Sequence, residues 1–278
     1  MMQLFHDVST QCSKLTTQKY STSFNGAIKL LHKELRTPIH NIYGFVRFAD
    51  EIVDTFHEHN KAELLEEFKI ETYKALERKI SLNPILNSFQ LTINQYEIDT
   101  KLIDSFFKSM ECDLNKTFYD EEGYKNYVYG SAESVGLMCL HIFCEKDFEK
   151  YESLKSHAQS LGAAFQKVNF LRDAKADYQN LDRTYFPEVD FRNFTNEVKT
   201  SIEEDIMKDF AHAYKGIKEL PMKARFGVYV AYKYYFSLFK KIKRTQAEII
   251  LEERIRIPNY SKTLILVRAG VKNRLNLI

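Results

Sequence analysis

Glycine and proline, the residues that end helices and form tight turns, are scarce along this chain. Nine glycines and five prolines make up only 14 of the 278 residues, whereas average usage of the two together is roughly 12%. Sheets with many tight turns need both residues. The chain is therefore predicted to be almost entirely helical. Its glycines also form neither G-x-G nor G-x-x-x-x-G-K, which removes the usual support for Rossmann and P-loop nucleotide binding.

Apolar residues recur at helical spacing along most of the chain. Thr37 and Pro38 resemble the N-cap and first residue of a helix that continues to about residue 57. Further helices are predicted over residues 61–80, 84–95, 99–116, 121–144, 150–176, 195–215 and 222–250, whereas residues 177–194 lack clear periodicity. No Ser/Gly-rich linker and no internal repeat divides the sequence, so residues 1–278 are predicted to form one all-α domain.

The cysteine, histidine and hydropathy patterns exclude several classes of protein. Four cysteines form no C-x-x-C pair and eight histidines form no H-E-x-x-H motif, so neither a zinc site nor a disulfide framework is expected. No apolar run approaches ~18 residues, which argues against a transmembrane helix. The opening sequence MMQLFHDVSTQCSK lacks the basic and apolar regions of a signal peptide, which favours a cytoplasmic location.

Positive charge is concentrated towards the C-terminal end. Residues 240–278 contain ten Lys and Arg against three Glu, a net charge of +7, although the whole chain carries only +2. Such a segment suits phosphate groups or transient, peripheral contact with an anionic membrane, and a solvated helical face is the alternative. Nucleic acid is not an expected partner, because no nucleic-acid-binding signature accompanies the charge.

A polar stripe lies on the otherwise apolar 38–57 segment. Tyr43, Arg47, Asp50 and Asp54 fall within ~60° of one another on a helical wheel. Carboxylates at i and i+4 repel each other on a helix, and the sequence FVRFADEIVDTF around them is apolar enough to indicate burial. Buried charges need partners or a cation. Glu51 lies just beside the stripe and could support it.

A second stripe repeats this pattern on the 150–176 helix and just beyond it. Gln166, Asn169, Asp173 and Asp177 lie within ~80° of one another. Oxygen ligands without His or Cys suit a hard cation, and Mg²⁺ prefers few protein ligands together with waters and phosphate oxygens. The neighbouring Arg172, Arg183 and Tyr185 could hold phosphate. Together the stripes predict two helices that face each other across a cavity, where metal ions bind a diphosphate.

Five blocks in order along the chain carry a resemblance to a known family. They are residues 20–24 (YSTSF), Arg36 with residues 42–54 (IYGFVRFADEIVD), Met110 with Asp113 and Leu114, residues 127–136 (YVYGSAESVG), and residues 169–173 (NFLRD) followed by Asp177, Arg183, Tyr185 and Pro187. These blocks resemble the squalene/phytoene synthase family, whose members are head-to-head prenyl transferases with an all-α isoprenoid-synthase fold around a central cavity. Glu133 stands where the family usually has Gly, and its carboxylate could narrow or repolarise the helix that lines that cavity.

The resemblance implies an activity and a set of residues for it. Two geranylgeranyl diphosphates would condense through a cyclopropyl diphosphate to phytoene, in carotenoid biosynthesis, without NAD(P)H. The implied ligands of Mg²⁺, or alternatively Mn²⁺, are Asp50, Asp54, Asn169, Asp173 and Asp177. The implied diphosphate contacts are Ser21, Tyr43, Arg47, Gln166, Arg172 and Arg183. Tyr127 would line the cavity near the reacting carbons and, with the four aspartates, make up the catalytic set.

The sequence leaves two alternatives to a phytoene synthase open. One is a relative that uses farnesyl diphosphate and makes squalene or dehydrosqualene. The other is a helical assembly factor without activity, which the presence of both acidic motifs disfavours.

Overall fold

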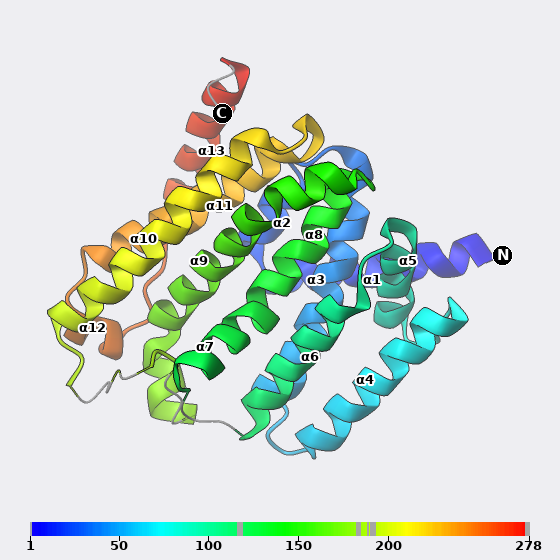
Figure 1. Cartoon of the computed structure of the whole chain (residues 1–278), viewed down its shortest axis with the longest axis horizontal. Coiled ribbons are helices and arrows are strands. Elements are labelled where there is room, and N and C mark those ends of the chain that lie inside the picture. Colours follow the sequence, from blue (N-terminus) through cyan, green and yellow to red (C-terminus); the bar gives the residue numbers. More distant parts are fainter. Residues whose placement is uncertain (1, 116–118, 182–184, 188, 190–192, 276–278) are drawn as a thin grey trace.

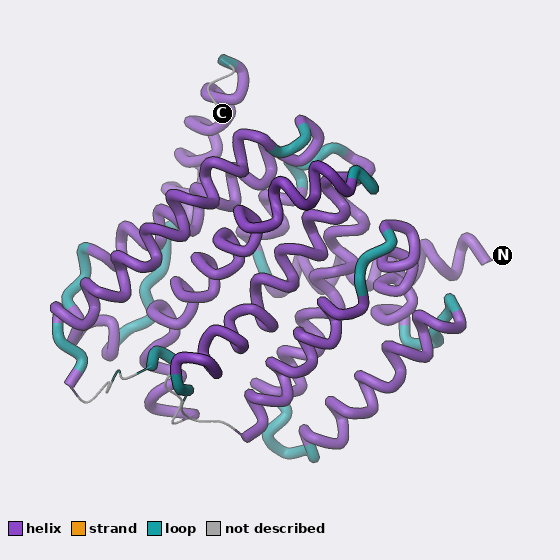
Figure 2. Tube along the Cα trace, in the orientation of Figure 1, coloured by secondary structure: helices purple, strands orange, loops and turns teal. Residues whose placement is uncertain are grey.

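The computed structural model describes residues 2–115, 119–181, 185–187, 189 and 193–275, without the side chains of residues 115, 176–181 and 259. Every regular element in these ranges is a helix (Figure 2), which confirms the all-α prediction. The elements are α1 (Met2–Tyr20), α2 (Thr22–Ile28), α3 (Lys33–Asp54), α4 (Lys61–Arg78), α5 (Pro84–Tyr96), α6 (Thr100–Asn115), α7 (Glu121–Val128), the π-helix η1 (Tyr129–Glu133), α8 (Ser134–Cys144), α9 (Phe148–Leu181), α10 (Asn196–Glu219), α11 (Met222–Lys243), α12 (Ala247–Glu252) and α13 (Asn259–Arg274).

The long helices form a bundle in which α6, α8, α9 and α10 lie side by side, with α3 and α11 behind them (Figure 1). Helices α1 and α4 lie towards one edge, and α12 and α13 towards the other. Among the described helices, none is both long enough and apolar enough to cross a membrane.

Aromatic side chains fill the core on one side of the bundle. Phe45 of α3 stacks on Phe89 of α5 with ring centroids 3.8 Å apart, and it contacts Phe106 and Phe107 of α6. All four side chains are fully buried. Because Phe45 lies on the opposite side of α3 from the predicted polar stripe, burying it turns Tyr43, Arg47 and the aspartates away from this core.

Two glycines allow the π-helix to approach its neighbours closely. A Cβ on Gly130 would lie 2.3 Å from the carbonyl oxygen of Ser105 in α6, and one on Gly162 would lie 2.7 Å from the carbonyl oxygen of Ala132. No larger side chain fits these positions without moving backbone. The Ser134 hydroxyl donates to the Gly130 carbonyl at 2.6 Å. Helices α6 and α9 are thereby held against η1, which lines the interior of the bundle.

The predicted helix boundaries were wrong in several places. Helix α3 begins at Lys33 rather than at Pro38, which lies inside it. Proline costs a helix interior one backbone hydrogen bond, but the fully buried Leu35 holds the preceding turn against the core. Helices α1 and α2 precede the first predicted helix, and α9 continues past residue 176 to Leu181. The predicted 121–144 helix contains the π-helical turn, and the predicted 222–250 helix is divided after Lys243.

Candidate active site

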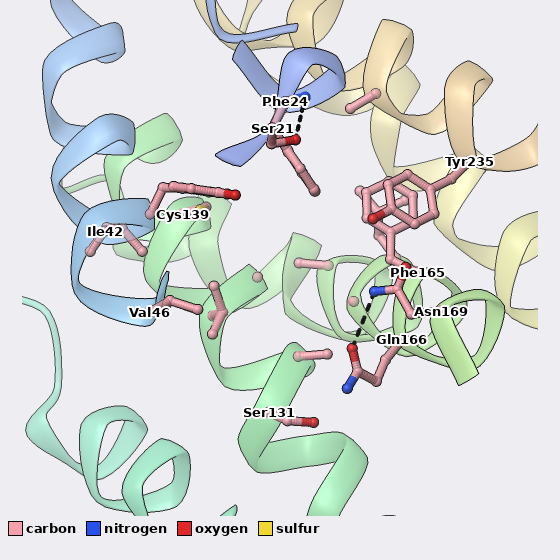
Figure 3. Close-up of a pocket in the computed structure, with 18 of the residues that line it drawn as sticks. Ser21, Phe24, Ile42, Val46, Ser131, Cys139, Phe165, Gln166, Asn169 and Tyr235 are labelled. Carbon is pink, nitrogen blue, oxygen red and sulfur yellow. Dashed lines mark hydrogen bonds between the residues drawn. The ribbon is translucent and has the colours of Figure 1, made fainter. Parts of the chain in front are cut away.

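A cavity of about 860 Å³ lies inside the bundle, between α2, α3, α8, α9 and α11. Figure 3 shows Ser21, which precedes α2, with Val46 of α3, Cys139 of α8, Gln166 of α9 and Tyr235 of α11 around this common space. The polar lining residues come mainly from the C-terminal halves of α3 and α9, and apolar side chains of α8, α10 and the first half of α9 line much of the rest. The cavity therefore combines a charged region with an apolar region.

The first predicted stripe lines this cavity along its whole length. Tyr43, Arg47, Asp50 and Asp54 are all lining residues. The Arg47 guanidinium lies 3.9 Å from Asp50 Oδ2, forms an ion pair with Glu51, and stands 4.5 Å from the centroid of the Tyr20 ring. Glu51 thus supports the stripe by holding its arginine, as its place beside the stripe suggested.

The two aspartates of α3 repel each other in this environment. Burial, reinforced by the negative charge of Asp54, raises the pKa of Asp50 to about 7, although the charge of Arg47 lowers it. The Asp50 side chain is 32% exposed, but that exposure opens into the cavity. A cation bound between these carboxylates would relieve their repulsion.

The second stripe approaches the same cavity from α9. Gln166, Asn169, Arg172 and Asp173 line it. The Asn169 amide nitrogen lies 3.5 Å from Gln166 Oε1 (Figure 3). The Asn169 Oδ1 atom is buried and accepts no hydrogen bond from the described residues. A buried oxygen of this kind without a hydrogen-bond donor is uncommon, and it suits a position that a cation would bind.

Asp173 is held by two arginines from different parts of the chain. Arg172 Nε lies 3.0 Å from Asp173 Oδ1, and Arg254 Nε lies 2.8 Å from the same oxygen. Arg254 also lines the cavity. In the sequence it is only one of ten basic residues near the C-terminal end, and no local pattern marks it. Sequence analysis therefore missed this residue as part of the site.

The oxygen atoms near the two stripes fit a magnesium ion. Among the described residues, no group of three or more His, Cys, Asp or Glu side chains could hold a metal by itself. Mg²⁺ commonly takes one or two carboxylates and completes its coordination with waters and substrate phosphates. The Asp50–Asp54 pair and the unsatisfied Asn169 Oδ1 match that requirement.

Tyr127 lines the cavity within a cluster of aromatic rings. Its hydroxyl donates a hydrogen bond of 2.8 Å to Asp113 Oδ2, and its ring stacks on Tyr185 with centroids 5.1 Å apart. Tyr185 in turn stacks on Phe170 at 4.2 Å. Burial, followed by the charge of Asp113, raises the pKa of Tyr127 well above its ordinary value. The phenol is therefore neutral and held in one orientation.

Ser21 lines the cavity, and its hydroxyl caps α2 by accepting from the Phe24 amide at 3.2 Å. The Asp177 side chain and Arg183 lie outside the described residues.

Glu133 is not among the residues that line the cavity, and its carboxylate accepts a hydrogen bond from Gln159 of α9 instead. The Glu133 carboxylate is thus directed towards α9, while its neighbour Ala132 lines the cavity.

The chain matches the squalene/phytoene synthase family over residues 17–261. It belongs to this family. Phytoene synthase 1, chloroplastic, of Zea mays is 26% identical over 81% of this chain, which spans 59% of the length of the maize protein. The phytoene synthase of Cereibacter sphaeroides is 24% identical over 81% of this chain and 69% of its own length.

Solved structures of squalene/phytoene synthase relatives share the fold. A dehydrosqualene synthase aligns with a TM-score of 0.81 at 19% identity, covering 97% of this chain and 98% of its own. The squalene synthase HpnC of Alicyclobacillus acidocaldarius aligns with a TM-score of 0.75 at 18% identity, covering 86% and 94%. The resemblance stated from the five sequence blocks and the predicted fold class are both confirmed.

Proposed function

We propose that the protein is a prenyl transferase that condenses two molecules of geranylgeranyl diphosphate head to head into phytoene, a step of carotenoid biosynthesis. The observation that carries the proposal is a cavity in which carboxylates and arginines of α3 and α9 occupy one region and apolar side chains line much of the rest. Such a cavity suits a ligand with a charged head and a long hydrocarbon tail. Membership of the chain in the squalene/phytoene synthase family, and its phytoene synthase relatives, support prenyl diphosphates as the substrate class.

The charged region would bind the diphosphates. Arg47 and Arg172 can donate charge-assisted hydrogen bonds to phosphate oxygens, and Ser21, Tyr43 and Gln166 offer neutral donors beside them. Burial raises the pKa of Tyr43 to about 12, so its hydroxyl remains a donor at neutral pH. Arg183 is assigned the same role from the sequence alone.

The acidic residues would hold the metal. Asp50, Asp54, Asn169, Asp173 and Asp177 are the proposed ligands of Mg²⁺, or of Mn²⁺ in its place. When bound, the ion would supply positive charge that stabilises the departing diphosphate. Before substrate arrives, Arg172 and Arg254 neutralise Asp173, and Arg47 and Glu51 pair with each other. The arginines are thereby kept beside the position that a diphosphate would take.

The apolar region would protect the reacting carbons from water. Loss of diphosphate from one substrate gives an allylic cation, and the double bond of the second substrate attacks it. A proton is then lost and a cyclopropyl diphosphate forms. Loss of the second diphosphate, rearrangement and a second proton loss complete phytoene. Aromatic faces such as Tyr127 and Phe165 stabilise cations while excluding water.

A product assay tests the proposal. Purified protein is incubated with Mg²⁺ and either farnesyl or geranylgeranyl diphosphate, with and without NADPH, and the hydrocarbons are identified by mass spectrometry. We expect phytoene from the C20 substrate regardless of NADPH, and no product when the metal is chelated. Squalene or dehydrosqualene from the C15 substrate alone would replace the proposed substrate with the shorter one. Absence of product from both substrates would refute the enzymatic function and favour the assembly-factor alternative.

A further inference from the structure

The last helix carries apolar residues on the side that faces away from the protein. Four of them, Tyr260, Leu264, Val267 and Val271, fall within ~60° of one another on a helical wheel, and Leu275 follows directly after the helix. We call these five residues the outer stripe. Their exposed fractions range from 48% for Leu264 to 76% for Tyr260. On the opposite side of α13, Ala269 is buried and Ile265 packs against the core. Helix α13 packs on α11 at the edge of the bundle (Figure 1). It is thus attached by one face and presents a second apolar face to solvent.

Positive charges border the outer stripe. Arg268 and Lys272 follow it on one side of the wheel and Arg274 on the other, and α13 contains no acidic residue. The adjacent α11 adds Lys233 and Lys240, whose amines stand 5.6 and 4.7 Å from the centroid of the same Phe236 ring. Within the described part of the chain, none of these five cations pairs with a carboxylate.

The pKa of Lys233 also indicates that positive charges crowd this surface. Burial lowers the pKa of Lys233, and the charges of Lys240 and Lys272 lower it further. Positive charges of α11 and α13 thus meet at Lys233. An anionic surface would relieve this repulsion.

We propose that the outer stripe and its bordering cations bind an anionic lipid surface, with α13 lying in the interfacial plane. An apolar stripe with Lys and Arg along its edges is typical of helices that insert shallowly between lipid headgroups. A second copy of this chain is a poorer occupant, because a two-fold contact through α13 would bring like charges together. Charge complementarity therefore favours anionic lipid.

This surface is narrower than the one that the sequence suggested. There the whole 240–278 segment was the candidate for membrane contact, with its lysines from 240 onwards and its apolar residues at 249–251 and 264–266. In the structure Ile250 is fully buried, and Lys241 donates to the Arg256 carbonyl at 2.8 Å. The contact is therefore assigned to the outer stripe and not to the whole 240–278 segment.

The position of α13 suits release of an insoluble product, and in this respect the inference rests on the proposed function. Lys262 in its first turn donates to the Thr22 hydroxyl of α2 at 3.3 Å. Helix α2 also supplies lining residues such as Phe24 and Ile28 to the cavity. A membrane contact at α13 would thus lie beside an element of the cavity wall.

Vesicle cosedimentation tests the charge component. The full chain is mixed with vesicles of phosphatidylcholine, with or without phosphatidylglycerol, at low and at high salt. We expect binding only to the anionic vesicles, with release by salt. Arg268→Gln/Lys272→Gln should weaken binding at low salt about 25-fold, since each cation near such a surface contributes ~1 kcal/mol and 1.4 kcal/mol is tenfold. The matched control is Lys101→Gln/Lys108→Gln on α6, which should bind as the wild type does.

The apolar component is tested with Leu264→Ser/Val267→Ser/Val271→Ser. This variant should lose vesicle binding while keeping its circular dichroism spectrum and melting temperature, because the residues are exposed. Leu4→Ser/Leu15→Ser on α1, which alters two equally exposed leucines elsewhere, is its control.

Three results would overturn the proposal. They are equal binding to neutral and anionic vesicles, equal effects of the α13 variants and their controls, and a concentration-dependent dimer that the serine variant abolishes. Product formation is assayed separately in detergent micelles. Loss of vesicle binding with retained turnover identifies a membrane defect, whereas binding without turnover counts only against the proposed function.

Discussion

Replacing Glu133 with glutamine should stabilise the protein above neutral pH and change little in mild acid. The Glu133 carboxylate accepts a 3.0 Å hydrogen bond from Gln159 Nε2 between η1 and α9. Burial raises the pKa of Glu133 from 4.5 to about 7; the Gln159 hydrogen bond lowers it, Asp209 raises it and Lys167 lowers it. The folded protein therefore holds a proton on this side chain that the unfolded chain releases at lower pH.

The direction of the effect follows from this difference. Since the folded-state pKa lies above the unfolded value, the neutral carboxyl contributes stability that is fully present below about pH 4.5 and is lost as the pH rises through about 7. A pKa raised from 4.5 to about 7 corresponds to about 3 kcal/mol of unfolding free energy. Glutamine is neutral at every pH and nearly the same size, so it should avoid most of this loss.

Urea unfolding followed by circular dichroism provides the measurement. The unfolding free energy of Glu133→Gln minus that of the wild type should increase by about 2–3 kcal/mol between about pH 5 and pH 8. Glu67→Gln removes an exposed carboxylate from α4 and should show no such increase. If the difference for Glu133→Gln were the same at both pH values, the prediction would be wrong, because the carboxylate would then be accommodated in its charged form.

Three further predictions concern packing and the charged region. Gly162→Ala should destabilise the protein by about 1–3 kcal/mol, because its Cβ would meet backbone of η1. Gly270→Ala places its Cβ in open space and should stabilise the protein by about 0.5–1 kcal/mol. Equal urea midpoints for the two variants would contradict both expectations. Asp50→Asn should abolish product formation with little change in melting temperature, because removing one of two repelling charges does not unfold a helix. Full activity, or a large fall in melting temperature, would count against a metal-binding role. Glu67→Gln is the control. Arg47→Ala should weaken binding of a non-hydrolysable diphosphate analogue about tenfold or more, and unchanged affinity by calorimetry would remove Arg47 from the diphosphate site.

Much of the candidate site could be predicted from sequence because helix geometry is local. Residues three and four positions apart share a face whatever surrounds the helix. Tyr43, Arg47 and Asp50 were therefore placed on one face correctly, and so were Gln166 and Asn169, and both groups line the cavity. The all-helical fold followed from the scarcity of glycine and proline for the same reason, since each of these residues acts on its own turn of the chain.

Contacts between distant parts of the chain were decided only by the tertiary structure. Arg254 reaches Asp173 across 81 positions of sequence, and nothing near Arg254 distinguishes it from the other basic residues at that end. Glu133 is adjacent to cavity-lining residues, yet the close approach of α9 at Gly162 brings Gln159 to its carboxylate outside the cavity. The outer stripe is equally invisible in sequence, because apolar residues at helical spacing look alike on a buried and an exposed face. Periodicity determines which residues share a face of a helix, but packing determines what that face meets.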